Sequence, residues 1–260
     1  MRRQGPASPV ARIALPVLAA LAALAAWHAA VVLTRTTVFP RPAEVALGIA
    51  ELARKGILLP YVADSLRRVL SGYLAAAVAG IALGLLVGRS RALDRIVDPL
   101  VQLLRPISPL AWMPLAVIWF GVSELAPTFL IFLAAFFPIV VATTQAVLGI
   151  PPVLYQAAAN LGVGGAALVR RVVFPAIVPQ VLTGLRIALG IAWMVVVAAE
   201  MLGVDSGLGY LILDSRNAGA RYDLVLAGML LIGVIGLGLD LLMRRLERLP
   251  SVRWGFREAG

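Results

Sequence analysis

Apolar residues are concentrated in six stretches along the 260-residue chain, with shorter polar segments between them. Most of these stretches approach twenty residues, which is about the length that an α-helix needs to cross about 30 Å of hydrocarbon. The pattern predicts an all-α membrane protein with six transmembrane helices. The predicted spans are Ile13–Leu33, Val69–Val87, Ile107–Phe120, Leu125–Leu148, Ile177–Met201 and Leu224–Met243.

The segment between the first two spans is mixed in composition and is broken by prolines. Within it, residues 44–55 have the composition of a short surface helix. The third span is the shortest, and Pro106, Pro109 and Pro114 lie near or inside it. A cleaved signal peptide is an alternative interpretation of the first span, but its apolar run is long for a signal core.

Composition supports a membrane protein, and the charge pattern adds an orientation. Hydrophobic residues make up 61% of the chain, and the formal net charge is +10. On the six-span scheme this excess lies on one side, which holds the N-terminus with Arg2 and Arg3, the 89–105 loop, the 149–176 loop and the C-terminal tail. We therefore predict cytoplasmic termini, and charge that serves orientation and lipid headgroups rather than nucleic acid. Arg67 and Arg68 are the exception, because they adjoin the second span on the other side.

The residue types that carry common enzyme chemistry are scarce. The chain has no cysteine, its one histidine is His28, and its one lysine is Lys55, which lies outside any glycine-rich phosphate loop. Disulfides, thiolate metal sites and cysteine nucleophiles are excluded. A multi-histidine metal site is poorly supported, and a Walker-type nucleotide site is excluded. We expect no enzyme and no cofactor bound by this chain, so any ATP that drives it binds another polypeptide.

Small residues recur at helical spacing in the second span. Ala76, Gly80, Gly84 and Gly88 lie four apart and form one flat stripe. In lipid, such stripes let helix backbones approach closely. The stripe predicts helix packing, either within the chain or between two copies.

The loop between the fourth and fifth spans is patterned like a pair of short helices. After Pro151 and Pro152, an apolar face at i, i+3, i+4 and i+7 predicts a helix that Gly162 ends with a positive φ. A second short helix is expected at 166–173, stopped by Pro175. The residues of the first apolar face are Leu154, Ala157, Ala158 and Leu161. Local physics leaves two alternatives open: docking into a groove of another protein, or resting on lipid headgroups.

The same loop resembles the EAA motif of ABC importer permeases. Gln156-Ala157-Ala158 is followed after three residues by Gly162, and after nine more by residues 172–175, which end in Pro175. Gln156 departs from the motif's glutamate, so a charge-assisted contact would weaken there to a neutral hydrogen bond. Further similarity, to the nitrate, sulfonate and taurine branch, extends from about residue 60 to the end of the chain. It lies in residues 105–115, 119–121, 182–188, 197–201, 207–210 and 253–255.

This resemblance implies a type-I ABC importer permease fold with a cytoplasmic coupling helix. It divides the chain into an N-terminal helix with an extracytoplasmic connection (1–59), a transmembrane core (60–245) and a cytoplasmic tail (246–260). It implies a homodimer in a bacterial inner membrane, a cytoplasmic ABC ATPase dimer that binds ATP and magnesium, and an extracytoplasmic binding protein. The residues that would couple to the ATPase are Tyr155, Gln156, Ala157, Ala158, Gly162 and Pro175.

The substrate implied is a small anion such as nitrate, an alkanesulfonate or taurine. Bicarbonate and heterocyclic-precursor importers share much of the pattern and remain alternatives. A secondary transporter without an ATPase is a rival from another class, but the chain lacks the paired intramembrane carboxylates common in such proteins. An intramembrane enzyme is a second rival, and one histidine cannot supply its usual constellation.

The translocation path is predicted from irregular backbone and intramembrane charge. The prolines of the third span leave backbone groups unpaired, which is tolerated at membrane depth only where protein or water covers them. Arg186 would either face an anionic substrate or extend to the cytoplasmic surface. Glu200 would either pair with a basic residue in an outer gate or lie at the interface. The path candidates are Pro109, Trp112, Met113, Trp119, Arg186 and Glu200.

Overall fold

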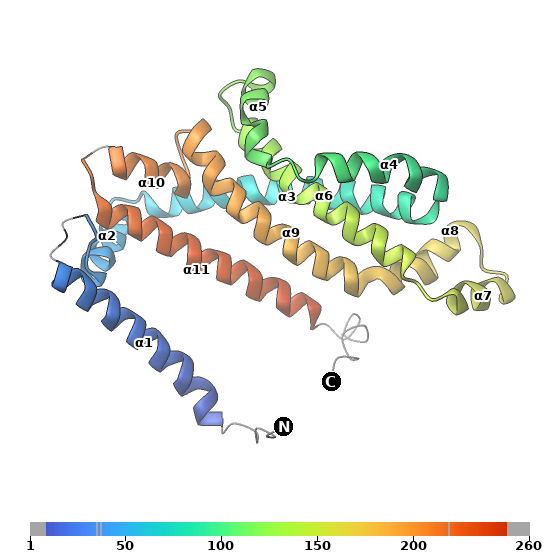
Figure 1. Cartoon of the computed structure of the whole chain (residues 1–260), viewed down its shortest axis with the longest axis horizontal. Coiled ribbons are helices and arrows are strands. Elements are labelled where there is room, and N and C mark those ends of the chain that lie inside the picture. Colours follow the sequence, from blue (N-terminus) through green and yellow to red (C-terminus); the bar gives the residue numbers. More distant parts are fainter. Residues whose placement is uncertain (1–8, 35, 37, 218, 249–260) are drawn as a thin grey trace. The chain divides into compact units, whose positions relative to one another are not determined.

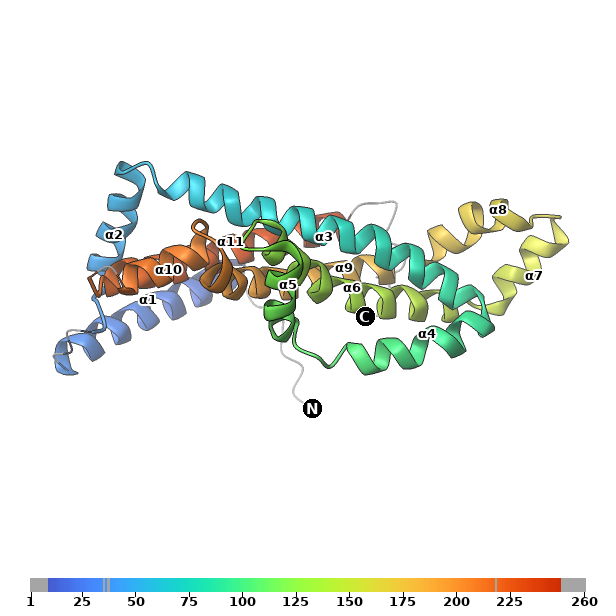
Figure 2. The same cartoon turned by 90° about the horizontal axis from the view of Figure 1, so that it is seen from above.

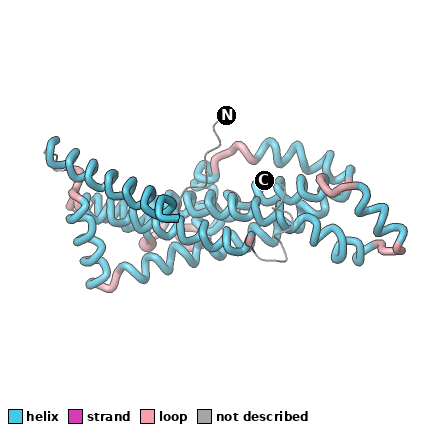
Figure 3. The backbone as a smooth tube through the Cα atoms, turned by 90° about the horizontal axis from the view of Figure 1, so that it is seen from below, coloured by secondary structure: helices cyan, strands magenta, loops and turns pink. Residues whose placement is uncertain are grey.

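The structure is a computed structural model that describes residues 9–34, 36, 38–217 and 219–248. Every described segment is helix or loop (Figure 3), as the sequence predicts. The helices are α1 (Pro9–Thr34), α2 (Pro42–Arg54), α3 (Leu58–Arg89), α4 (Arg91–Leu104), η1 (Pro109–Trp112), α5 (Met113–Phe120), α6 (Leu125–Leu148), α7 (Pro152–Asn160), α8 (Gly165–Leu168), η2 (Val169–Val173), α9 (Phe174–Gly203), α10 (Leu208–Asn217) and α11 (Tyr222–Glu247). Arg2, Arg3 and residues 253–255, which the sequence analysis used, lie outside the described residues.

Five of the described helices are long and apolar enough to cross a membrane, and a bent pair can supply a sixth. The predicted loop at 89–105 is wrong, because α4 occupies it. The third span is not one continuous helix: α4 and the η1–α5 segment form the bent pair, with an angle of 87° between them. Pro106 and Pro109 explain the bend, since each removes a backbone donor at the junction.

The second span begins earlier than predicted. α3 starts at Leu58 rather than near Val69, so Arg67 and Arg68 lie within the helix. The prediction failed there because two arginines normally mark the end of an apolar span. Arg68 is 1% exposed and is paired with acidic residues from other segments.

The chain forms two compact units. The first contains Met1–Leu59 and Leu211–Leu230. Within it, the Trp27 indole Nε1 donates to the Pro40 carbonyl at 3.1 Å. Arg221 contacts Glu51 of α2 at 2.6 Å and Asp223 in the first turn of α11 at 2.8 Å. These bonds connect α1 to the start of α2, and α2 to the start of α11.

The second unit contains Pro60–Tyr210 and Leu231–Gly260. α6 and α9 lie side by side through its centre (Figures 1 and 2). Two buried apolar clusters hold these helices together, one toward each end of the pair. α7 and α8 lie beyond the end at which α6 stops and α9 begins (Figure 2).

The small-residue stripe of α3 packs within the chain. A Cβ atom built on Gly80, Gly84 or Gly88 would lie 2.6–2.9 Å from a side-chain atom of α6. The α6 residues that meet the three glycines are Ile139, Thr143 and Val147, which also lie four apart. The two rows interlock, and the intrachain alternative left open by the sequence is the one observed.

Candidate functional site

α7 ends in a turn that its sequence specifies. Gly162 adopts φ +69°, as predicted. The N–H of Val163 donates to the Ala158 carbonyl at 2.9 Å, and the N–H of Gly162 donates to the Ala159 carbonyl at 3.0 Å. This pair of bonds is the Schellman arrangement, which satisfies carbonyls that the helix end would otherwise leave unpaired. The chain therefore reverses into α8 with its backbone groups paired.

One face of α7 is apolar and uncovered. Val153, Ala157 and Leu161 lie four residues apart and are exposed, as is Gln156. We call Val153, Ala157 and Leu161 the α7 stripe. Ala158, which the sequence placed on the outward face, is only 4% exposed and belongs to the protein's own packing. The helical period permits this, since residues adjacent in sequence lie about 100° apart around the axis.

The inner side of the same segment is anchored firmly. Tyr155 of α7 and Leu168 of α8 pack against a buried cluster that includes Val147 and Ile150 at the end of α6 and Ile177 in α9. A displacement of α7 would therefore reach both central helices directly. The coupling candidates divide into Tyr155 and Ala158, which face inward, and Gln156 and Ala157, which face outward.

Pro175 does not stop a helix, and that prediction is wrong. α8 continues through the π-helical turn η2 into α9, and residues 165–203 form one long helical stretch. In η2 the N–H of Phe174 donates to the carbonyl of Val169, five residues earlier. Pro175 follows in the first turn of α9, where a missing N–H is tolerated. The coupling segment is thus joined to α9 without a flexible break.

A buried ionic network lies at the opposite end of α9. Arg68 bonds to Glu124 through Nε and Nη2, both at 2.6 Å, and to Glu200 through Nη1 at 2.7 Å. Ser206 accepts the two remaining Arg68 donors, at its carbonyl (2.9 Å) and its Oγ (2.6 Å). Ser65 Oγ donates to Glu200 at 2.9 Å. We call Ser65, Arg68, Glu124, Glu200 and Ser206 the Arg68 network; it satisfies all five guanidinium donors.

Glycines make room for this network. The N–H of Gly209 donates to Glu200 Oε2 at 3.0 Å. Gly207 adopts φ +102°, and a Cβ on either glycine would collide with Glu200. The Glu124 pKa lies below its usual range, because Arg68 donates two hydrogen bonds to its carboxylate. The network therefore joins α3, the start of α6, the end of α9 and the connection to α10 in one charged cluster.

A cavity of about 230 Å³ lies midway along α6 and α9. It is lined by Leu133, Ala134, Phe137 and Pro138 of α6 and by Ile187 and Ile191 of α9. The bend between α4 and η1 completes it with Arg105, Ile107, Pro109 and Trp112. Two of the predicted path residues, Pro109 and Trp112, thus share one cavity. Arg105, which the sequence assigned to a cytoplasmic loop, lines it as well.

The other path candidates lie elsewhere. Met113 is buried in the apolar cluster at the Glu200 end of α9, beside Ala199. Trp119 is 56% exposed and stacks edge-on against Phe129 at 5.8 Å between ring centroids. Glu200 is held in the Arg68 network. None of these three lines the mid-helix cavity.

Arg186 is already neutralised. Its Nη1 donates to Glu247 at 2.8 Å, and its Nε lies 3.6 Å from Asp240. Asp240 also accepts from Arg244, which lies one turn later in α11, at 2.6 Å. With two carboxylates beside it, Arg186 is poorly suited to be the cation that meets an anionic substrate.

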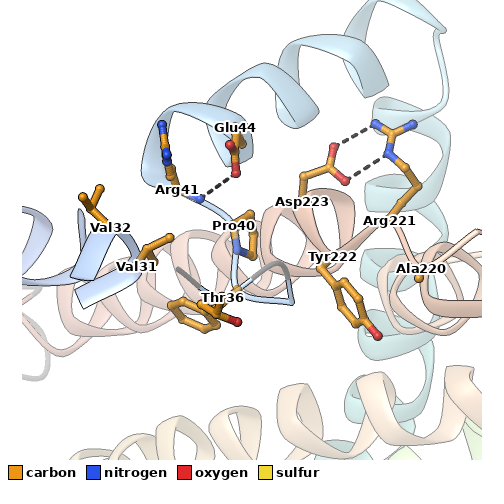
Figure 4. Close-up of a pocket in the computed structure, with 11 residues that line it drawn as sticks. Val31, Val32, Thr36, Pro40, Arg41, Glu44, Ala220, Arg221, Tyr222 and Asp223 are labelled. Atoms are coloured by element: carbon orange, nitrogen blue, oxygen red, sulfur yellow. Dashed lines mark hydrogen bonds and ion pairs between the residues drawn. The ribbon is translucent and has the colours of Figure 1, made fainter. Parts of the chain in front are cut away.

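The first unit holds a larger cavity, of about 610 Å³ (Figure 4). Within it, Arg221 faces Asp223, and Glu44 accepts the backbone N–H of Arg41 at 2.8 Å. Arg221 lowers the pKa of nearby Glu51 from 4.5 to about 2, chiefly by hydrogen bonding. This cavity contains none of the predicted path residues, and size alone does not make it the translocation path.

Comparison with known proteins identifies the family. Residues 78–251 match the family described as the binding-protein-dependent transport system inner membrane component. The chain belongs to this family. A protein of Methanocaldococcus jannaschii named as an ABC transporter permease is 42% identical to this permease, over 92% of this chain and 90% of its own. The taurine transport system permease protein TauC of Escherichia coli is 39% identical, over 74% and 69% respectively.

The fold comparison agrees with the family. A solved structure of the MetNI methionine ABC transporter, in an inward-facing conformation, matches 74% of this permease and 95% of its own chain. The TM-score is 0.66 at 19% sequence identity. The expected type-I importer fold and a multi-pass inner-membrane permease subunit are confirmed.

Sequence reasoning missed three features of the permease. Arg68 appeared as a violation of the charge rule, and that violation was itself the signal, because an arginine in an apolar span needs a buried partner. Arg105 directly precedes Pro106, and the break that the prolines indicate is where it comes to line the mid-helix cavity. Ser65 and Ser206 gave no signal, since serine is common at such positions and their roles depend on contacts between distant segments.

Proposed function

We propose that this permease, as a homodimer, forms the translocation path of an ATP-driven importer for a small anion such as nitrate, an alkanesulfonate or taurine. A binding protein delivers the substrate on the outer side, and a separate cytoplasmic ABC ATPase dimer binds ATP and magnesium. The termini are cytoplasmic, and the permease carries out no covalent chemistry. Bicarbonate and heterocyclic-precursor importers are the alternatives within the family.

The α7 stripe is the observation that carries the proposal. Three exposed apolar side chains on a short helix favour insertion into a groove of another protein. The inward side of that helix is fixed to α6 and α9 through Tyr155, and the following helix α8 is fixed to them through Leu168. A surface helix that merely rested on lipid headgroups would need no such rigid anchoring to both central helices. Each ATPase dimer offers two docking sites, and each permease chain offers one α7, which favours two copies of the permease.

Motion would pass along α9. This helix is 30 residues long, or about 45 Å, and it links the coupling segment at one end to Glu200 of the Arg68 network at the other. When ATP closes the ATPase dimer, α7 moves with its groove, and α6 and α9 rock between two packed states. The mid-helix cavity and the Arg68 network lie along this path, so both would open or close with the rocking.

Charged variants of α7 test the coupling role. Ala157→Asp places a carboxylate on the α7 stripe, and we expect the permease to insert normally but to lose ATPase binding and uptake. Ala159→Asp is the matched control, because Ala159 is also exposed but lies off the stripe. Ala158 is unsuitable, since its burial would make an aspartate disrupt the fold itself. Normal co-purification of the ATPase with Ala157→Asp would refute the role of α7, and uptake by the permease alone would indicate a secondary transporter.

A further inference from the structure

The mid-helix cavity combines one unpaired cation with an apolar wall. Among the described residues, the Arg105 guanidinium makes no hydrogen bond or ion pair. Two other arginines of the same unit are engaged: Arg68 with Glu124 and Glu200, and Arg186 with Glu247 and Asp240. Arg105 is thus the free cation of this cavity, and it lies beside the middle residues of two membrane-spanning helices.

Arg105 is an exposed residue, so a solute that enters the cavity can reach its guanidinium. Because no described residue pairs with this guanidinium, an anion in the cavity can do so. Arg186 lies only one residue from Ile187, which also lines the cavity, but its charge is balanced by α11. The positive charge available to a substrate therefore comes from the bend between α4 and η1.

The remaining lining selects among anions. Ile107, Trp112, Leu133, Phe137 and Ile191 present hydrocarbon and aromatic surface. Nitrate and bicarbonate carry no apolar part, so contact with such a wall gives them no compensation for the water that they lose. An alkyl chain, in contrast, gains by leaving water for this surface.

We propose that Arg105 binds the anionic head of an organic monoanion with an apolar tail, of the alkanesulfonate class, and that the cavity holds the tail. This inference rests on the proposed function, since it assigns the substrate contact of the same translocation path. Arg105 then acts as a specificity-determining residue, and discrimination depends on the tail as well as on the charge.

The test measures binding to the permease–ATPase complex in lipid nanodiscs by calorimetry. The probes are hexanesulfonate, methanesulfonate and nitrate. For the wild type we expect affinity to fall in that order. Arg105→Gln should weaken hexanesulfonate binding about 10- to 100-fold, as expected for loss of a hydrogen bond to a charged group. Arg105→Lys should retain most of the affinity, because the charge remains.

Two further variants complete the test, one as a control for loss of positive charge and one that probes the apolar tail of the ligand. Arg95→Gln removes an exposed arginine of α4 that does not line the cavity, and it should bind all three probes as the wild type does. Ile187→Trp narrows the cavity and should weaken hexanesulfonate far more than methanesulfonate. Wild-type binding of hexanesulfonate by Arg105→Gln, or nitrate binding as tight as that of hexanesulfonate in the wild type, would overturn the proposal.

ATP hydrolysis distinguishes this inference from the proposed function. If the wild-type complex hydrolyses ATP in response to the cognate binding protein while Arg105→Gln binds every probe normally, only the assignment of Arg105 fails. If no ATPase assembles with the wild-type permease, the proposed function fails as well. Arg105→Gln should elute and melt like the wild type, since Arg105 is exposed and its guanidinium makes no hydrogen bond or ion pair among the described residues.

Discussion

Gly84 of α3 lies directly against Thr143 of α6, with no space between them for a methyl group. A Cβ atom at Gly84 would lie 2.6 Å from the Thr143 Cβ and 2.9 Å from the carbonyl oxygen of Val140. Thr144 Oγ1 also donates to the Gly84 carbonyl at 3.4 Å. Where apolar burial gives helices little reason to associate, close backbone approach of this kind supplies the packing energy.

Gly84→Ala should therefore destabilise the permease although alanine favours helices. We expect a loss of about 1–3 kcal/mol, the usual cost of overpacking a tight interface. Gly190→Ala in α9 is the matched control, because nothing lies within 4 Å of a Cβ built there. Denaturant unfolding in detergent would give both values. Equal stability of Gly84→Ala and the wild type would contradict the tight α3–α6 contact.

The turn after α7 allows backbone conformation to be tested without a steric clash. Gly162 adopts φ +69° with nothing near a built Cβ, so a substitution there strains only the backbone. Gly162→Val should distort the turn, at a cost of at least about 1–2 kcal/mol for a left-handed residue, and greatly reduce uptake. Gly164→Val is the control two residues away, because Gly164 is extended (φ −134°) and its surroundings are equally open. Uptake assays on both variants check the prediction; if both lose uptake alike, bulk rather than φ controls the turn.

The spans could be predicted because hydropathy over twenty residues depends on composition alone. Helix α6 matches the fourth predicted span at both ends, Leu125 and Leu148. Prediction failed where a boundary depends on distant partners. α3 extends past two arginines only because Glu124 and Glu200, far along the chain, accept the charge of Arg68.

The site was predictable in its local parts and not in its assembled ones. The turn at Gly162 follows from one residue's conformational freedom, and the sequence showed it. The mid-helix cavity depends on an 87° bend that brings Arg105 to the middle of α6 and α9. Pro106 and Pro109 indicate a break at this point, but they do not give its angle. The sequence did not reveal the partner of Arg186, because Glu247 lies 61 residues further along the chain.

Glu51 should make the stability of the first unit depend on pH in the acid range. The Arg221 hydrogen bond lowers the Glu51 pKa from 4.5 to about 2, so its carboxylate stabilises the folded unit above pH 4.5. That stabilisation should fade as the pH drops from about 4.5 through about 2. Melting curves of wild type and Glu51→Gln should therefore differ at neutral pH and converge in acid. Glu44→Gln is the control in the same helix, because no ion pair involves Glu44 among the described residues; a gap that stayed constant with pH would count against the Glu51–Arg221 pair.

The Arg68 network should be strongly coupled in a double-mutant cycle. Arg68→Met leaves Glu200, which is fully buried, without its cation, and breaking a buried pair in this way costs about 3–5 kcal/mol. Arg67→Met is the matched control: Arg67 is 67% exposed and lies 3.5 Å from Glu124, so its loss should cost no more than about 1 kcal/mol.

Replacing both buried partners should recover much of the loss. In Arg68→Met/Glu200→Leu no uncompensated charge remains inside the protein, so the double variant should be more stable than the sum of the two single changes implies. Unfolding free energies of the four proteins, measured in the same detergent, give the coupling energy directly. Strictly additive changes would mean that Arg68 and Glu200 do not depend on each other, despite the 2.7 Å between Nη1 and Oε1.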